Sequence, residues 1–151
     1  MPEKQTLERA RRDKRQGKAA STQAGEFVRE EMHHIREGKH GARSTKQAIA
    51  IGLSKARRAG VSLPPPRKGR ASARTRKSAA SAYRKGKRGQ KTSRTRSQAR
   101  LKALKREGRS AASHRALSRQ GHSAALRRGS ASRRRAARKA ARTRSQERWS
   151  R

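Results

Sequence analysis

Histidine is the residue type in this chain best suited to metal binding, because its ring nitrogens are common metal ligands. Three of the five histidines lie close together in the sequence, namely His33, His34 and His40. The acidic residues around them are Glu30, Glu31 and Glu37. Adjacent histidines point to different faces of a helix, and there is no cysteine to join them. We therefore expect surface or ion-paired histidines, with no metal ion and no other cofactor.

Serine is the other candidate for chemistry, since many serines lie close to arginines, as at Ser97, Ser110 and Ser118. A serine nucleophile needs a general base held in a fixed site by a third group, and a disordered segment cannot hold one. Phosphorylation is chemically plausible, and each event would cut the positive charge by about 1.5–2 units. Neither a Walker loop nor a dinucleotide-binding fingerprint occurs in the sequence. We expect no catalytic residues and no enzymatic activity.

The composition limits what the elements that position these residues can be. The 151 residues include 46 Lys and Arg against 9 Asp and Glu, a formal net charge of +37. Leu, Ile, Val and Phe together number 13. These 13 residues are a far smaller share of the 151 than the roughly 20% under which a highly charged chain is usually disordered. Self-repulsion also opposes compaction. These features predict a mostly disordered chain with only a small all-α module.

The charge divides the chain at Pro64-Pro65-Pro66. Residues 1–66 have a net charge of +8, and residues 67–151 have a net charge of +29. Because a proline run is extended and cannot continue a helix, we interpret it as a linker, a proline-recognition ligand being the other reading. The expected parts are a charged segment at 1–21, a helical module at 22–60, a Pro-rich linker at 61–69 and an Arg/Ala/Ser-rich basic tail at 70–151.

The helical module is expected to hold two helices, over 24–37 and 44–59. Gly38 follows the first helix, where a left-handed residue is favoured. The second begins with a capping box between Ser44 and Gln47. The module has few large apolar side chains with which to form a core. We therefore expect at most a helical hairpin, which a partner or dimerisation would complete. The residues expected on its contact face are Val28, Met32, Ile35, Ile49, Leu53 and Ala56.

The basic tail is suited to nucleic acid. Arginine contacts phosphate in a bidentate manner, and neutralising phosphates releases condensed counterions. Proteins that bind single strands stack bases on aromatic rings, but the tail has only Tyr83 and Trp149. Duplex DNA, or else structured RNA, is therefore the expected partner. The cations expected to bind it are Arg74, Arg76, Lys77, Arg84, Lys85, Lys87, Arg88, Arg94, Arg96, Arg127, Arg128, Arg133, Arg134, Arg135, Arg138, Lys139, Arg142 and Arg144.

Short parts of the tail are expected to become helical on binding. Alanine and arginine favour helices, and alanines recur at helical spacing between 136 and 141. Like charges at i and i+4 oppose the helix in the absence of an anion, as between Arg134 and Arg138 and between Arg138 and Arg142. Phosphates would remove that penalty.

One stretch of the N-terminal half resembles a known family. It runs from Glu31 to Lys39 and then from Ser44 to Arg57, with Lys-Gln-Ala-Ile-Ala-Ile-Gly-Leu-Ser-Lys-Ala-Arg at its centre. This is similar to a small bacterial family of uncharacterised domains, some of which are labelled plasmid stabilisation or DNA-binding proteins. Gly52 stands where that family has alanine, which would weaken the helix by up to about 1 kcal/mol. The tail resembles histone H1-like bacterial proteins in composition only.

Together these features predict a cytoplasmic, nucleoid-associated bacterial protein that binds duplex DNA without sequence specificity, or a plasmid-maintenance accessory protein. One alternative is an RNA- or ribosome-associated basic protein. Another is a protein-interaction module that binds a partner, or a second copy, through its helices and uses the tail as an electrostatic tether. The longest apolar run has six residues, Ala48 to Leu53, against the about 20 that span a membrane. We expect no stable membrane insertion.

Overall fold

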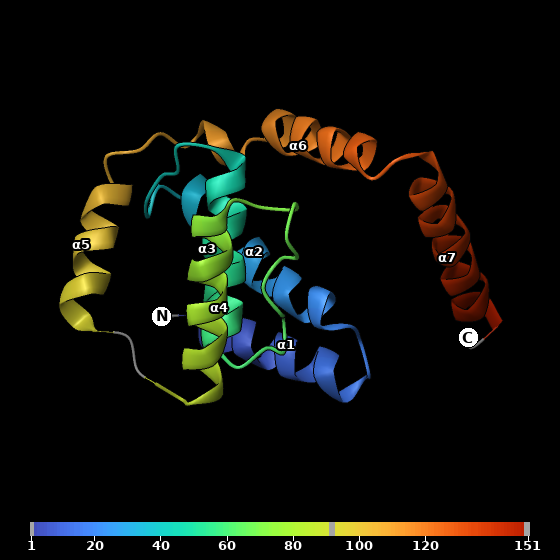
Figure 1. Cartoon of the computed structure of the whole chain (residues 1–151), viewed down its shortest axis with the longest axis horizontal. Helices are drawn as coiled ribbons and strands as arrows, with labels where there is room; N and C mark the ends of the chain where they lie inside the picture. The colour runs from blue at the N-terminus through green and yellow to red at the C-terminus, as the bar shows by residue number, and fades with distance from the viewer. Residues whose placement is uncertain (1, 91–92, 150–151) are drawn as a thin grey trace. The chain divides into compact units, whose positions relative to one another are not determined.

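The computed structural model describes residues 2–90 and 93–149, and 72% of the chain is helical (Figure 1). Two compact units follow each other along the chain, Met1–Ser113 and His114–Arg151. The helices of the first unit are α1 (Lys4–Arg15), α2 (Ala20–Arg36), α3 (Thr45–Arg58), α4 (Ala73–Lys87), α5 (Arg94–Leu104) and the short 3-10 helix η1 (Ser110–Ala112). Those of the second unit are α6 (His114–Arg127) and α7 (Ser130–Trp149).

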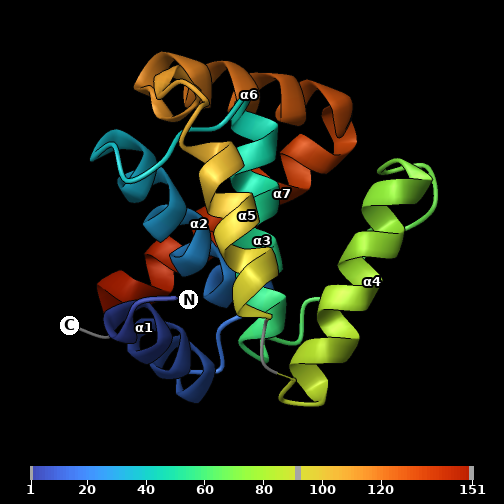
Figure 2. The same ribbon diagram turned by 90° about the vertical axis from the view of Figure 1, so that its left-hand side faces the viewer.

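The first unit is built on α2 and α3, which pack against each other. α1 packs against α2, α4 packs against α3, and η1 contacts both α2 and α3 (Figures 1 and 2). A central hydrophobic cluster joins α1, α2, α3 and the segment that follows α3. Its buried members are Ala10, Ala24, Phe27, Ala56 and Val61.

The prediction of a mostly disordered chain is wrong. It rested on the number of large apolar side chains, whereas the core is made mainly of alanine. Among the residues that the structure describes, nine of the 14 buried apolar residues are alanines. Alanine loses no side-chain entropy on burial and lets helices approach closely. Alanine, arginine and lysine also have high helix propensity, so the composition that predicted disorder in fact favours helices.

The basic tail forms helices without a bound polyanion, and the expectation that it becomes helical only on binding is wrong. Helix α7 runs unbroken through Arg134, Arg138 and Arg142. A like-charge pair at i and i+4 costs only about 0.2–0.5 kcal/mol. The propensity of the many alanines and arginines along α7 offsets a cost of that size.

The two helices expected in the module are present as α2 and α3, although α2 begins four residues earlier than the pattern indicated. Gly38 has a φ of +77°, as its position after α2 predicted. Ser44 Oγ accepts a hydrogen bond from Gln47 N at 3.2 Å. Gln47 Oε1 instead accepts from Arg43 N, at 2.8 Å, one residue before the expected donor.

The segments on either side of this helix pair pack against it. Thr6 and Ala10 of α1 are buried. After α3, Val61 is buried, and the Arg57 guanidinium donates hydrogen bonds to Leu63 O at 3.1 Å and Pro64 O at 3.4 Å. The chain around the prolines therefore lies against α3.

In the described part of the second unit there are two helices, α6 and α7, and α6 has no buried residue. In α7 every side chain from Arg133 to Gln146 is exposed. Leu126, near the end of α6, is 66% exposed. Across the part of the chain that the structure describes, no helix combines the length and the apolar character needed to cross a membrane.

Candidate nucleic-acid interface

Six cationic side chains line one cleft of the first unit, formed by α3, α4 and α5 (labelled in Figure 2). The cleft has a volume of about 390 Å³, and none of the described residues that line it is acidic. We call it the basic cleft. Its cations are Arg58, Arg74, Lys77, Lys85, Arg96 and Arg100.

Helical spacing explains why these side chains meet. On α4, Arg74, Lys77 and Lys85 recur at intervals of three and eight residues, which places them on one face. Ser78 and Ser81 lie on the same face and also line the cleft. The hydroxyls can donate to an anion bound between the cations.

Small side chains bring α4 close enough to α3 for this arrangement. Ala79 and Ala82 are the buried residues of α4, and α4 packs against α3. The start of α4 is capped by Ser72, whose Oγ accepts from Thr75 N at 3.2 Å. The buried side chains of α4 are therefore alanines rather than large apolar residues.

The end of α5 is held by the loop that follows α2. Leu104 is buried, and its carbonyl accepts a hydrogen bond from Gly41 N at 2.9 Å. Ala42 N donates to Gly108 O at 3.0 Å. These contacts anchor the segment from which Arg96 and Arg100, one helical turn apart, reach the cleft.

The cations of the basic cleft repel one another. Burial, and then the charges of Arg100 and Arg96, lower the pKa of the Arg58 guanidinium from its ordinary value. With no carboxylate in the described lining, a bound anion would relieve this repulsion. The cleft is thus arranged for a negatively charged ligand.

The structure divides the predicted nucleic-acid contacts among three places. Four of them line the basic cleft: Arg74, Lys77, Lys85 and Arg96. Five more lie on or just after α4 and α5, outside the cleft lining: Arg76, Arg84, Lys87, Arg88 and Arg94. The remaining nine lie in the second unit: Arg127, Arg128, Arg133, Arg134, Arg135, Arg138, Lys139, Arg142 and Arg144.

Sequence reasoning missed Arg58 and Arg100. Arg58 stands at the end of α3, where a cation suits the helix dipole, and nothing in the sequence indicated that this end meets α4 and α5. Arg100 could have been found, because it lies four residues after Arg96, the spacing that puts two residues on one helix face.

In the second unit, the cations follow lines along α7. Arg134, Arg138 and Arg142 recur at i, i+4 and i+8, and each is exposed. Arg135 and Lys139 form a parallel line one residue further on. This gives α7 a continuous positive face by itself.

The aromatic residues do not form a platform for bases. Phe27 is fully buried in the core. The ring of Tyr83 is faced by Lys87 Nζ, 5.0 Å from its centroid. The side chain of Trp149 lies outside the described part of the structure.

The expected contact face of the helical module lies within the first unit. Met32, Ile35 and Ala56 are buried, whereas Val28, Ile49 and Leu53 are half-buried. Ala56 belongs to the central cluster, with Leu53 packed against it. Much of the face is therefore covered by the chain itself.

Two of the three clustered histidines come together beside an acidic residue. Single ligand atoms of Glu31, His34 and His40 lie within 4.8 Å of one another. His33 instead faces away, with a side chain 69% exposed. The rule that adjacent histidines diverge thus holds for His33 and His34, but it does not keep His34 apart from His40.

Comparison with known proteins bears on the N-terminal half. Residues 14–69 match a protein family described as a family of unknown function, DUF6496. The matched residues include the stretch whose motif resembles an uncharacterised family. The description of the matched family names no activity, no partner and no association with plasmids. No curated protein and no solved structure matches the chain.

Proposed function

We propose that this protein binds duplex DNA through the phosphate backbone, with little sequence preference, as a nucleoid-associated or plasmid-maintenance accessory protein. The observation that carries the proposal is the basic cleft, in which six cations meet without a carboxylate in the described lining. Burial, and then the charges of Arg100 and Arg96, lower the pKa of Arg58. Phosphate groups placed in the cleft would offset the repulsion among these cations.

The surroundings of the cleft favour an extended polyanion over a small anion. Arg84, Lys87 and Arg88 are exposed on the same helix that lines the cleft or just after it. The second unit adds the positive face of α7. A small phosphate compound could satisfy the cleft but would leave these cations unused, whereas a nucleic-acid backbone continues beyond it.

The aromatic residues favour a duplex over a single strand. Binding of single strands draws about 1–3 kcal/mol per base from stacking on aromatic rings. Phe27 is buried, and one face of Tyr83 is occupied by Lys87. Arginine, which outnumbers lysine in the tail, can contact phosphate in a bidentate manner and can enter a narrow minor groove.

The proposal is tested by measuring affinity for a mixed-sequence duplex by fluorescence anisotropy across a range of salt concentrations. Engagement of 6–10 phosphates predicts a loss of about 10³–10⁵-fold in affinity between 50 and 200 mM salt. A shallow salt dependence would contradict binding through phosphates.

A pair of matched variants locates the contact. Arg74→Gln/Lys77→Gln/Arg100→Gln removes three cations from the basic cleft and should reduce the slope of log affinity against log salt by about 2.7. Arg11→Gln/Arg12→Gln/Lys14→Gln removes three exposed cations from α1 and should leave the slope near that of the unaltered chain. Equal reductions in both would mean that net charge, and not the cleft, determines binding.

Structured RNA, titrated in parallel at the same salt, decides between the two nucleic acids. Tighter binding to the duplex at every salt concentration supports the proposal. A clear preference for the RNA would assign the protein to the RNA- or ribosome-associated class instead.

A further inference from the structure

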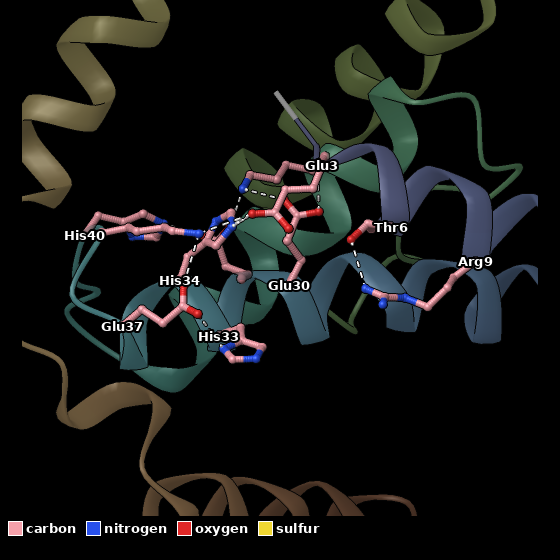
Figure 3. A network of polar contacts seen from close by, with 11 residues as sticks. Glu3, Thr6, Arg9, Glu30, His33, His34, Glu37 and His40 are labelled. Atoms are coloured by element: carbon pink, nitrogen blue, oxygen red, sulfur yellow. Dashed lines mark hydrogen bonds and ion pairs between the residues drawn. The ribbon is translucent and has the colours of Figure 1, made fainter.

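Acidic residues concentrate at one place in this basic chain, around the C-terminal half of α2 (Figure 3). Ion pairs there join four carboxylates to two lysines, Lys39 and Lys55. With neutral imidazoles the group has a net charge of −2, in a chain whose formal charge is +37. The carboxylates are Glu3, Glu30, Glu31 and Glu37.

Two of these carboxylates are buried and share one lysine. Glu30 and Glu31 are 3% and 0% exposed. Lys55 Nζ lies 2.7 Å from Glu31 Oε2 and 3.5 Å from Glu30 Oε1. Within the described residues, no contact with hydrogen-bond geometry reaches either oxygen of Glu31. One ammonium cannot neutralise two carboxylates, and a buried charge without compensation is costly.

His40 presents a lone pair to this carboxylate. Its Nδ1 lies 3.1 Å from Gly41 O. A carbonyl only accepts hydrogen bonds, so Nδ1 carries the hydrogen, and Nε2 of the neutral ring carries a lone pair. That Nε2 lies 3.3 Å from Glu31 Oε1. Two acceptors facing each other in a buried site require a cation between them, either a proton or a metal ion.

His34 completes the group. It follows Glu31 by three residues on α2 and therefore projects from the same face. Its side chain is 12% exposed, and its Nε2 lies 2.7 Å from Glu3 Oε1. The rings of His34 and His40 meet edge to face, with centroids 6.1 Å apart. One ligand atom from each of Glu31, His34 and His40 falls within 4.8 Å of the others.

We propose that Glu31, His34 and His40 bind Zn²⁺. Two imidazole nitrogens and one carboxylate oxygen are a ligand set that zinc accepts, with the fourth position left open. The hydrogen bond from His40 Nδ1 to Gly41 O is the outer contact that a metal-binding histidine usually makes. Bonds from zinc to nitrogen or oxygen are about 2.0–2.2 Å long. The three side chains must therefore move closer together than the 4.8 Å that now spans their ligand atoms. The nearby Glu3 carboxylate adds negative charge that favours a divalent cation.

The site would also bear on the loop that anchors α5. Gly41, next to His40, donates to Leu104 O, and Ala42 donates to Gly108 O. A bound ion would tie His40 to α2 and so hold this loop in place. Zinc binding here does not depend on nucleic-acid binding, and it can be tested without nucleic acid.

The test follows the imidazole NMR signals of the full chain during titration with ZnCl₂, with MgCl₂ as a comparison. We expect saturation at one equivalent of Zn²⁺, with shifts at His34 and His40 and none at His33, His114 or His122. Mg²⁺ should shift none of the five. Uniform shifts at all histidines, or no shift at His40 after one equivalent, would overturn the proposal. Because this measurement uses the unaltered chain, it decides the question even if a variant fails to fold.

Calorimetry on two variants gives a second readout. His40→Ala removes a ligand and should weaken Zn²⁺ binding by more than about 100-fold, since loss of an outer-shell contact alone costs about 10–100-fold. His33→Ala removes an exposed neighbour and should leave the affinity unchanged. Equal weakening in both variants would show that the ion binds elsewhere.

Discussion

Gly52 of α3 lies directly against the backbone of Val28 in α2. A Cβ atom at position 52 would stand 2.7 Å from Val28 Cα and 3.0 Å from Phe27 O. The sequence suggested that Gly52 merely weakens its helix, where a related family has alanine. The structure shows what the glycine does: because Gly52 has no side chain, the backbones of α2 and α3 can lie in contact.

Replacing this glycine should therefore destabilise the protein. Gly52→Ala gains up to about 1 kcal/mol of helix propensity, but overpacking a filled contact costs about 1–3 kcal/mol. We expect a lower free energy of unfolding in urea. Gly25→Ala is the control, because Gly25 is an exposed residue of α2 where an added Cβ would have nothing within 4 Å. It should stabilise by about 0.5–1 kcal/mol, and a gain in both variants would contradict close contact at Gly52.

Arg57 should matter for stability. Its guanidinium is buried and donates to Leu63 O and Pro64 O, and burial lowers its pKa. Arg57→Ala leaves both carbonyls without these donors, at a cost of about 1.5–3 kcal/mol for hydrogen bonds to a charged group. Thermal unfolding should show the loss, and limited proteolysis should cut sooner between α3 and α4. Unchanged cleavage there would argue that Arg57 does not hold this segment.

Arg58, the next residue, should matter for binding. It lines the basic cleft, where burial, and then the charges of Arg100 and Arg96, lower its pKa. Arg58→Gln is expected to weaken duplex binding and to reduce the slope of log affinity against log salt by about 0.9. Its effect on unfolding should be smaller than that of Arg57→Ala. If Arg57→Ala weakened duplex binding more than Arg58→Gln did, and Arg58→Gln lowered stability more, the roles assigned to the two arginines would be wrong.

The pH dependence of two exposed carboxyl groups should distinguish their partners. The hydrogen bond with His34, and then that with Lys39, lowers the pKa of Glu3 below 4.5, whereas Lys39 is the main cause for Glu37. Both contributions to stability are present above pH 4.5 and are lost as the pH falls through the lowered pKa values. Lys39→Met should return the pKa of Glu37 close to its ordinary value but that of Glu3 only in part. An NMR titration of the carboxyl carbons measures both, and equal recovery would contradict the assigned causes.

The free protein should already be helical. Far-UV circular dichroism without nucleic acid should give a helix content near the 72% of the structure. Addition of duplex DNA should leave that content nearly unchanged, because α4 to α7 are formed in the unbound chain. A large rise in helicity on binding would instead support coupled folding of the basic tail.

Local signals predicted the two central helices well. The capping residue Ser44 and the terminal Gly38 act on their immediate neighbours, so the sequence contains most of the information about them. The packing of α1 and α4 was not predicted, because it depends on Ala10, Ala79 and Ala82. These side chains carry no periodic hydrophobic signal in a chain so rich in alanine.

The candidate sites depend on contacts between residues that are distant in sequence. Arg58 meets Arg96 and Arg100 only because α4 and α5 return to the end of α3. His40 reaches Glu31 only because the chain turns back after α2. Composition correctly identified where cations are abundant, but it could not show which of them face one another.

The alanine core has a thermodynamic consequence. Each buried alanine removes little apolar surface from water, and it is apolar surface that raises the heat capacity when a protein unfolds. We therefore expect a heat capacity of unfolding below the usual 12–15 cal/mol/K per residue. The curve of stability against temperature should be correspondingly flat, so that this protein loses its fold over a broad range of temperature.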